Sequence, residues 1–147
     1  MRAVVTRVSG AEVEIGGEQY SSIGKGLLVL LGVHESDTHT QAEKIADRLC
    51  KIRIFEDESG KMNVSPDKAG AQLLIVSQFT LYADCKQRRP GFSAAARPEK
   101  AAELYECCIA KCRGLGFTVA TGRFGADMKV SSVNDGPVTI ILDTDVL

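Results

Sequence analysis

Two short runs of uninterrupted apolar residues constrain the fold of this chain more than any other feature. The first runs from Gly26 to Val33 and the second from Leu73 to Val76. Both have the length of a strand and neither alternates with polar residues, so both faces of each strand must be covered by other parts of the protein. The chain must therefore fold around a buried sheet.

Two helices are predicted to cover this sheet. The hydrophobic period becomes helical over residues 38–53, and capping boxes that begin at Thr38 and at Thr40 both fit the start. A second helix is predicted to begin at Pro98 and to have Gly114 as its C-terminal cap. The apolar stripe of the first helix is Ala42, Ile45, Ala46, Leu49, Cys50 and Arg53, and that of the second is Leu104, Tyr105, Cys108, Ile109 and Cys112.

The other segments predict more strands and two loops. Residues 3–8 and 11–15 alternate and precede a Gly16-Gly17 turn, which is typical of a hairpin. Residues 55–70 and 84–97 have the composition of loops. Strands are predicted at 117–121, 128–133 and 138–143. The expected fold is a single α+β domain over residues 1–147, with mostly antiparallel, barrel-like sheets and two main helices packed on one face.

Composition and charge restrict the possible partners. The 147 residues include 18 basic and 19 acidic side chains, a net charge of −1, so a nucleic acid would have to be held by a local basic patch. No apolar run approaches the roughly 18 residues of a membrane span. The start, Met1 to Val5, lacks the apolar region of a signal peptide. We therefore expect a soluble, cytoplasmic protein without a membrane partner.

The five cysteines do not form a recognisable framework. Cys108 and Cys112 are four residues apart on one helical face, but no C-x-x-C motif and no nearby histidine support a metal site. We expect buried, reduced thiols and no metal. The cysteines are Cys50, Cys85, Cys107, Cys108 and Cys112.

The second apolar strand runs directly into polar residues, Ser77 to Thr80. A core strand gains nothing from this change, whereas a binding or catalytic site needs hydrogen-bonding groups there. Thr80 has two explanations. Threonine has a high strand propensity, which could account for it beside an apolar strand, or Thr80 could be a nucleophile, which would require an adjacent base. His34 and His39 are the only histidines, and neither belongs to a recognisable catalytic arrangement, so a Ser–His–Asp type of triad is not supported.

A second polar motif, Asn134 to Thr139, opens the last predicted strand. Asp135-Gly136 is a strong hairpin-turn signal between two strand-like runs. Pro137 argues against a simple turn because proline cannot donate a hydrogen bond to a sheet. Gly136-Pro137 also permits a cis peptide, which would present backbone carbonyls without a side chain and could line a small pocket.

Together with residues 121–128 and the Arg7-Val8 pair, these two motifs resemble the signature of the bacterial-type D-aminoacyl-tRNA deacylases, the D-tyrosyl-tRNA(Tyr) deacylase family. The resemblance covers essentially the whole chain. It implies a homodimer with each active site at the subunit interface. The implied reaction is chiral proofreading: the ester of D-aminoacyl-tRNA is hydrolysed, L-aminoacyl-tRNA is rejected and glycyl-tRNA is not excluded. No metal or organic cofactor is implied.

The resemblance also implies roles for single residues. Ser77, Gln78, Phe79 and Thr80 would hold the aminoacyl-adenosine end of the tRNA, and backbone N–H groups near Phe79 and Thr80 could stabilise an oxyanion. The attacking group would be either Thr80 itself or a water assisted by the 2′-hydroxyl of the tRNA, and we favour the water.

A chiral filter from the opposite subunit completes the implied site. Gly136 and Pro137 would leave no room for an L side chain. Arg7 would brace their loop. Phe124 and Met128 would shape the pocket, although core packing explains both residues equally well.

Phosphate contacts and competing functions remain open from the sequence. The alternative functions are an L-specific editing domain, a non-catalytic RNA-binding dimeric module and a threonine-nucleophile esterase. Gly136-Pro137 argues against the first of these.

The candidate tRNA contacts are basic residues, although a solvated basic loop would also explain them. They are Lys86, Arg88, Arg89, Arg97 and Lys100.

Overall fold

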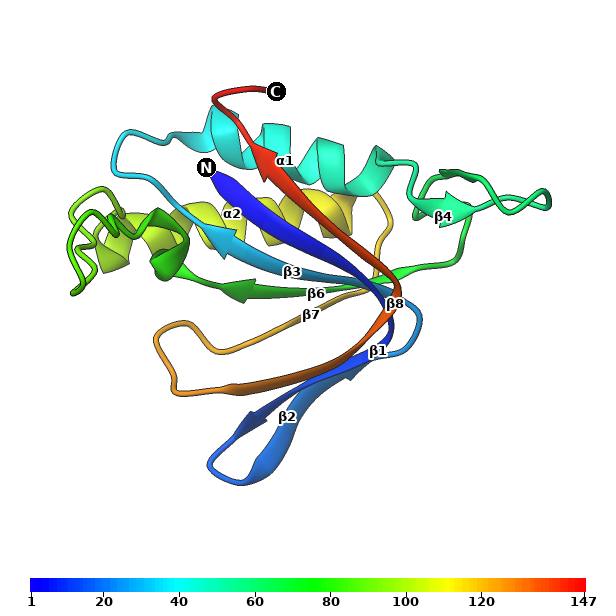
Figure 1. The fold of residues 1–147 in the computed structure, drawn as a ribbon, viewed down its shortest axis with the longest axis horizontal. Coiled ribbons are helices and arrows are strands. Elements are labelled where there is room, and N and C mark those ends of the chain that lie inside the picture. The colour runs from blue at the N-terminus through cyan, green and yellow to red at the C-terminus, as the bar shows by residue number, and fades with distance from the viewer.

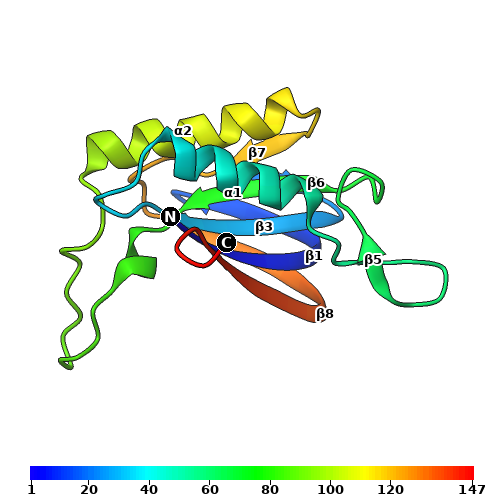
Figure 2. The same ribbon diagram turned by 90° about the horizontal axis from the view of Figure 1, so that it is seen from above.

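The computed structural model describes all 147 residues and places two helices over one face of a strongly curved sheet (Figures 1 and 2). The strands are β1 (Arg2–Ile15), β2 (Glu18–Ile23), β3 (Gly26–Gly32), β4 (Phe55–Glu56), β5 (Met62–Val64), β6 (Gln72–Ser77), β7 (Val119–Thr121) and β8 (Lys129–Asp143). The helices are α1 (His39–Lys51), the short 3₁₀-helix η1 (Phe79–Tyr82) and α2 (Pro98–Gly114).

The main sheet is mixed and almost closes into a barrel. Its strand order is β2-β1-β3-β6-β7, with β8 paired to the other side of β1. The β3–β6 and β6–β7 pairs are parallel and the pairs made by β1 are antiparallel. The hydroxyl of Ser21 in β2 donates a hydrogen bond of 2.7 Å to the carbonyl of Thr121, at the opposite end of this order. The predicted α+β, barrel-like class with two main helices is confirmed, and the sheet contains more parallel pairing than expected.

The apolar side chains form two packed clusters, one on each face of β3 and β6. The larger cluster joins the sheet to α1 and α2, and the smaller one fills the concave side of the curled sheet. Leu27, Val29 and Leu73 belong to the first cluster, whereas Leu28 and Leu74 belong to the second. This confirms that both apolar strands are covered on both faces. The predicted helical stripes are buried too, apart from Arg53, which lies beyond the end of α1 and is exposed.

Two predicted pairs of strands prove to be single long strands. The runs at 3–8 and 11–15 join in β1, and the runs at 128–133 and 138–143 join in β8. Asp135-Gly136 is therefore not a hairpin turn. Asn134 pairs with Val8 and Thr139 pairs with Thr6, so residues 135–138 bulge out of β8 opposite the single residue Arg7.

The ends of the helices and one loop also differ from the prediction. Of the two possible capping boxes, the structure uses the one at Thr38, whose backbone N–H donates to Gln41 Oε1 at 2.8 Å. Gly114 is the last residue of α2, and Gly116 takes the left-handed conformation, with φ 94°. The predicted loop at 55–70 contains the small hairpin β4–β5. Neither α1 nor α2 is long and apolar enough to cross a membrane.

A buried ion pair lies where β1 begins. The α-ammonium group of Met1 donates to Asp37 Oδ1 at 2.7 Å and to the Thr144 hydroxyl at 2.7 Å. Asp37 Oδ2 also accepts the backbone N–H of His34 at 2.7 Å. These contacts join the start of β1 to the β3–α1 connection and to the segment that follows β8.

Candidate active site

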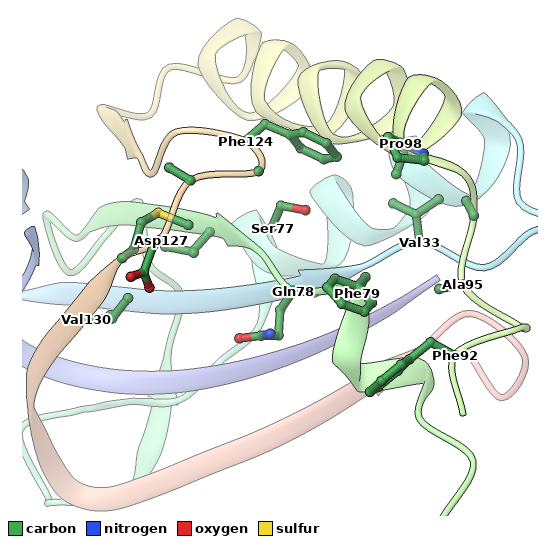
Figure 3. Close-up of a pocket in the computed structure, with 16 residues that line it drawn as sticks. Val33, Ser77, Gln78, Phe79, Phe92, Ala95, Pro98, Phe124, Asp127 and Val130 are labelled. Atoms are coloured by element: carbon green, nitrogen blue, oxygen red, sulfur yellow. The ribbon is translucent and has the colours of Figure 1, made fainter. Parts of the chain in front are cut away.

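A cavity of about 620 Å³ opens where β6 ends, between the start of α2 and the segment that leads into β8 (Figure 3). Eleven of its 16 lining residues are hydrophobic, and Asp127 is the only charged one. An apolar cavity with a few polar groups is the usual form of a small-molecule site. The lining residues are Val33, Val76, Ser77, Gln78, Phe79, Phe92, Ala95, Ala96, Pro98, Ala101, Phe124, Gly125, Ala126, Asp127, Met128 and Val130.

The first sequence motif forms one wall of this cavity. Ser77 is the last residue of β6, and the Gln78 backbone N–H donates to the Leu31 carbonyl at 2.8 Å before the chain turns into η1. Ser77, Gln78 and Phe79 line the cavity. Thr80 is exposed beside it and does not line it. Its hydroxyl accepts a hydrogen bond of 2.6 Å from Gln78 Nε2.

The two histidines are engaged elsewhere. The ring of His34 lies 2.8 Å from the Ser36 hydroxyl through Nδ1 and packs edge-on against Tyr82. His39 Nε2 lies 3.1 Å from Glu103 Oε1 on the exposed side of the helices. Neither histidine thus contacts the Thr80 hydroxyl. Its hydrogen-bond partner is the side-chain amide of Gln78, which cannot serve as a general base.

The segment between β7 and β8 supplies the opposite wall. Phe124 and Met128, the two residues for which the resemblance implies a pocket-shaping role, both line the cavity. The ring of Phe124 packs against Tyr105 at 6.0 Å between centroids. Tyr105 is buried, which raises the pKa of its phenol, and the phenol donates to the Ile75 carbonyl at 2.7 Å. This anchors the wall to β6.

The second motif lies apart from the cavity of its own chain. The Gly136-Pro137 peptide is cis, and neither residue lines the cavity. Arg7 is buried and holds the bulge from beneath, with Nε donating to the Asp135 carbonyl at 2.9 Å and Nη1 donating to the Ile54 carbonyl at 2.7 Å. Within one chain the two motifs thus occupy different sites.

The predicted basic residues divide into two groups. Lys86, Arg88 and Arg89 are exposed on an arm (residues 84–91) whose ends are joined by two backbone hydrogen bonds. Arg97 is exposed at the start of α2, and the ammonium group of Lys100 is hydrogen-bonded to the Glu35 carbonyl.

The cysteines do not contribute to the site. Cys50, Cys108 and Cys112 are buried, as predicted, and a hydrogen bond with Cys108 together with burial raises the pKa of the Cys112 thiol to about 12. No three His, Cys, Asp or Glu side chains gather where they could hold a metal ion.

Of the lining residues that were not predicted as site residues, Phe92 and Asp127 are the most distinctive, since one is an exposed aromatic ring and the other is the only charged group. The loop sequence around Phe92 carried one usable signal, because a phenylalanine is unusual in an otherwise polar and basic segment. Asp127 belongs to a segment used for the resemblance, but nothing in its own surroundings distinguished it from a solvated carboxylate.

Comparison with known proteins gives a consistent result. A family model described as D-Tyr-tRNA(Tyr) deacylase matches residues 4–143. The chain is 52% identical to a D-aminoacyl-tRNA deacylase of Symbiobacterium thermophilum, over 99% of this chain and 97% of the relative. It is 53% identical to a D-aminoacyl-tRNA deacylase of Clostridioides difficile, over 98% and 97% of the two chains.

Solved structures agree with this comparison. A structure named c-Myc DNA Unwinding Element Binding Protein is 41% identical and superposes with a TM-score of 0.93 over 98% of this chain and 99% of the other. A probable eukaryotic D-amino acid tRNA deacylase, 16% identical, shares the fold with a TM-score of 0.84 over 96% of this chain and 97% of the other. The family match over nearly the whole sequence and the closely related deacylases show that this chain belongs to the D-aminoacyl-tRNA deacylase family of hydrolases.

Proposed function

We propose that this chain hydrolyses the ester bond of D-aminoacyl-tRNA in the cavity beside η1 and releases the free D-amino acid and tRNA. Family membership supports the reaction. The observation that carries the choice of site is that Ser77, Gln78 and Phe79, the core of the first signature motif, line a mostly apolar cavity of about 620 Å³. The activity removes wrongly attached D-amino acids during translation, so the protein acts in the cytoplasm.

The start of η1 supplies groups suited to this chemistry. The first N–H groups of a helix have no acceptor within the helix, so those of Phe79 and Thr80 are available for the oxyanion that forms when the ester carbonyl is attacked. The lining beside them is mostly apolar, and hydrogen bonds to a developing charge are stronger in such surroundings than in water.

The attacking group in this proposal is a water positioned with help from the 2′-hydroxyl of the terminal ribose. Thr80 has only the Gln78 amide beside its hydroxyl, and an amide cannot remove a proton. Its exposure outside the cavity also favours a positioning role over direct attack.

A second copy of the chain supplies the chiral filter. Gly136 and Pro137 are exposed on β8 and are absent from their own cavity, so they are free to enter the cavity of a partner subunit. Backbone carbonyls presented there leave no space for an L side chain. Glycine has no side chain to exclude, so glycyl-tRNA is also hydrolysed.

The acceptor end of the tRNA is held by basic residues near the cavity. Lys86, Arg88 and Arg89 on the arm are exposed and free to meet phosphates. Arg97 adds a charge at the start of α2, whereas Lys100 is partly occupied by the Glu35 carbonyl.

The first test is release of the amino acid from matched D-tyrosyl-, L-tyrosyl- and glycyl-tRNA by the purified protein. We expect rapid loss of the D ester, measurable loss of the glycyl ester and no loss of the L ester. Equal hydrolysis of both enantiomers would favour a generic esterase, hydrolysis of the L ester alone an L-specific editing domain, and no hydrolysis a non-catalytic RNA-binding module.

The role of Thr80 is tested by Thr80→Ala. If water attacks with help from the RNA, the variant keeps measurable turnover of D-tyrosyl-tRNA, and a substrate that ends in 2′-deoxyadenosine loses it. Complete loss of turnover in Thr80→Ala with unchanged tRNA binding would instead make Thr80 the nucleophile.

The basic arm is tested by reversing the charges of Arg88 and Arg89 together. We expect weaker tRNA binding at 50 mM salt. We also expect the plot of log binding constant against log salt concentration to become shallower, by about one unit of slope for each phosphate that the variant no longer neutralises. Lys61→Glu on the β4–β5 hairpin is the matched control, because Lys61 is exposed and distant from the cavity lining. Equal binding by both variants would exclude the arm as a phosphate-binding element.

A further inference from the structure

Two aromatic rings lie exposed together at the rim of the cavity. The side chains of Phe79 and Phe92 are 54% and 37% exposed, and both line the cavity. Their ring centroids lie 5.1 Å apart with an angle of 75° between the ring planes (Figure 3). Neither ring belongs to a buried core cluster. Their packing therefore does not depend on the interior of the fold.

The basic arm connects to this aromatic pair. Phe92 directly follows Gly91, whose backbone exchanges hydrogen bonds of 2.8 and 2.9 Å with Asp84, so the base of the arm is fixed beside the cavity. The rest of the arm extends away from the body of the protein (Figure 2). Cavity, aromatic pair and basic tip thus follow one another outward along one side of the molecule.

This order fits the end of a single-stranded RNA. Unstacked bases of single-stranded RNA bind to aromatic side chains, while the backbone follows basic residues. The arm carries Lys86, Arg88 and Arg89 against the single acidic residue Asp84, so its tip is positively charged. This charge suits the polyanionic backbone of a nucleic acid better than an apolar protein surface.

We propose that Phe92, supported by Phe79, is a stacking platform for the base that precedes the terminal adenosine of the tRNA. The proposal rests on the proposed function, because it takes the cavity to hold the terminal aminoacyl-adenosine. The platform recognises the π-face of the base rather than its hydrogen-bonding edge, so it tolerates any base. Its effect is to hold the 3′ end in line with the cavity, and Phe92 is a binding residue and not a catalytic one.

The test compares two D-tyrosyl esters, one of adenosine alone and one of the trinucleotide CCA. Phe92→Ala should raise KM for the trinucleotide ester about tenfold more than it raises KM for the adenosine ester, because Phe92 lines the cavity as well as forming the platform. Phe92→Trp should keep the wild-type KM for both esters because it preserves a flat ring. Tyr20→Ala is the matched control, since Tyr20 is an aromatic residue of β2 that is 48% exposed and does not line the cavity.

Two results would overturn the platform. An equal rise in KM for both esters would make Phe92 only a wall of the cavity, and an unchanged KM for the trinucleotide ester would mean that no base stacks there.

A binding measurement separates this proposal from the proposed activity. A CCA trinucleotide with 2-aminopurine in place of the second cytosine should lose fluorescence on binding to the wild-type protein and to Phe92→Trp, and should lose much less with Phe92→Ala. If the wild-type protein hydrolyses no D ester but this quenching is seen, the proposed function fails and the platform stands. If hydrolysis is seen without quenching, the platform fails alone.

Discussion

At the scale of single residues, Gly136 combines a strained backbone angle with a lack of space for any side chain. Its φ is 139°, a value that side-chain-bearing residues rarely adopt, and an added Cβ would lie 2.7 Å from Val138 Cγ2 and 3.0 Å from Arg7 Nη2. Any side chain here would have to move either the bulge or the buried guanidinium that holds it.

We therefore expect Gly136→Ala to lower the rate of D-tyrosyl-tRNA hydrolysis at least tenfold and to destabilise the protein by roughly 1–3 kcal/mol. Amino acid release and urea denaturation measure the two effects. Gly24→Ala is the control, because an added Cβ there would meet only Gln72 Oε1, at 4.0 Å. Equal activity of the two variants would show that the bulge tolerates a side chain.

The candidate site was predictable in part: the sequence identified several residues of the cavity wall, but not which side chains face the cavity. Ser77 and Gln78 could be identified because polar groups at the end of an apolar strand have no structural purpose there, whereas Phe79 was identified only through the family resemblance. The exposure of Thr80 could not be foreseen, since the turn of η1 that directs it away from the cavity is a backbone feature. Phe92 stood out only as a phenylalanine in a polar segment, and its place beside the cavity, like that of Asp127, results from long-range folding.

At the scale of elements, a guanidinium clamp holds η1 against the sheet. Arg2 Nη1 donates to the Leu81 carbonyl at 2.8 Å, and Arg2 Nε donates to Asp143 Oδ2 at 2.9 Å. The same guanidinium lies over the ring of Tyr82, 4.8 Å from its centroid. The clamp joins β1 and β8 to the short helix that carries Thr80, so it sets the position of one cavity wall.

Removal of the clamp should affect both activity and stability. We expect Arg2→Ala to raise KM for D-tyrosyl-tRNA several-fold and to destabilise the fold by about 1–2 kcal/mol, because the variant removes a charged hydrogen bond and the packing on the Tyr82 ring together. Lys51→Ala is the control, since it removes only the exposed Lys51–Asp47 pair on α1 and should change stability by less than about 0.5 kcal/mol. An unchanged KM in Arg2→Ala would mean that η1 holds its position without the clamp.

The clamp also has a pH signature. Burial alone would raise the pKa of Asp143, but hydrogen bonds from the Asp145 backbone N–H and from Arg2 outweigh it and lower the pKa below its ordinary value. A lowered folded-state pKa stabilises the protein above the ordinary carboxyl pKa of about 3.9 and loses this effect as the pH falls further. The stability difference between wild type and Asp143→Asn should therefore be largest near neutral pH and shrink below about pH 4.

The elements themselves were predictable where one local pattern dominates. The two helices and the doubly buried strands have strong periodic or apolar signals, and they appear where expected. The continuity of β1 and β8 was not predictable, because each contains residues that normally end a strand. In β8 the strand continues past these residues because they form the bulge opposite Arg7. Arg7 holds the bulge by a hydrogen bond to the Asp135 carbonyl, 128 residues away in sequence.

At the scale of the whole molecule, β8 leaves a long strand edge without a partner. It pairs only with β1, so its other edge is open over a strand of 15 residues. The side chains of Val133 and Ile141 on this strand are 62% and 66% exposed. A long edge strand with exposed apolar residues is unusual in a monomeric protein. Such an edge is a suitable interface for a second copy of the same chain.

We expect the wild-type protein to sediment as a dimer and Ile141→Asp to sediment as a monomer with reduced activity, because the charge would be buried at the interface. Sedimentation velocity measures the state directly. Val146→Asp is the control, since Val146 is 84% exposed but lies beyond the end of β8. A wild-type monomer that remains fully active would contradict both the interface and the filter from a partner subunit.

The long pairing of β1 with β8 also determines when the fold can be completed during synthesis. Arg2 and Asp143 are 141 positions apart, yet they lie side by side in neighbouring strands. During synthesis the N-terminus emerges from the ribosome first, so β1 can pair early with β2 and β3. The other edge of β1 stays unpaired until β8, the last strand, has been synthesised. Until then that edge of β1 has no partner within the chain, so it is the part of the nascent protein most exposed to pairing with other chains.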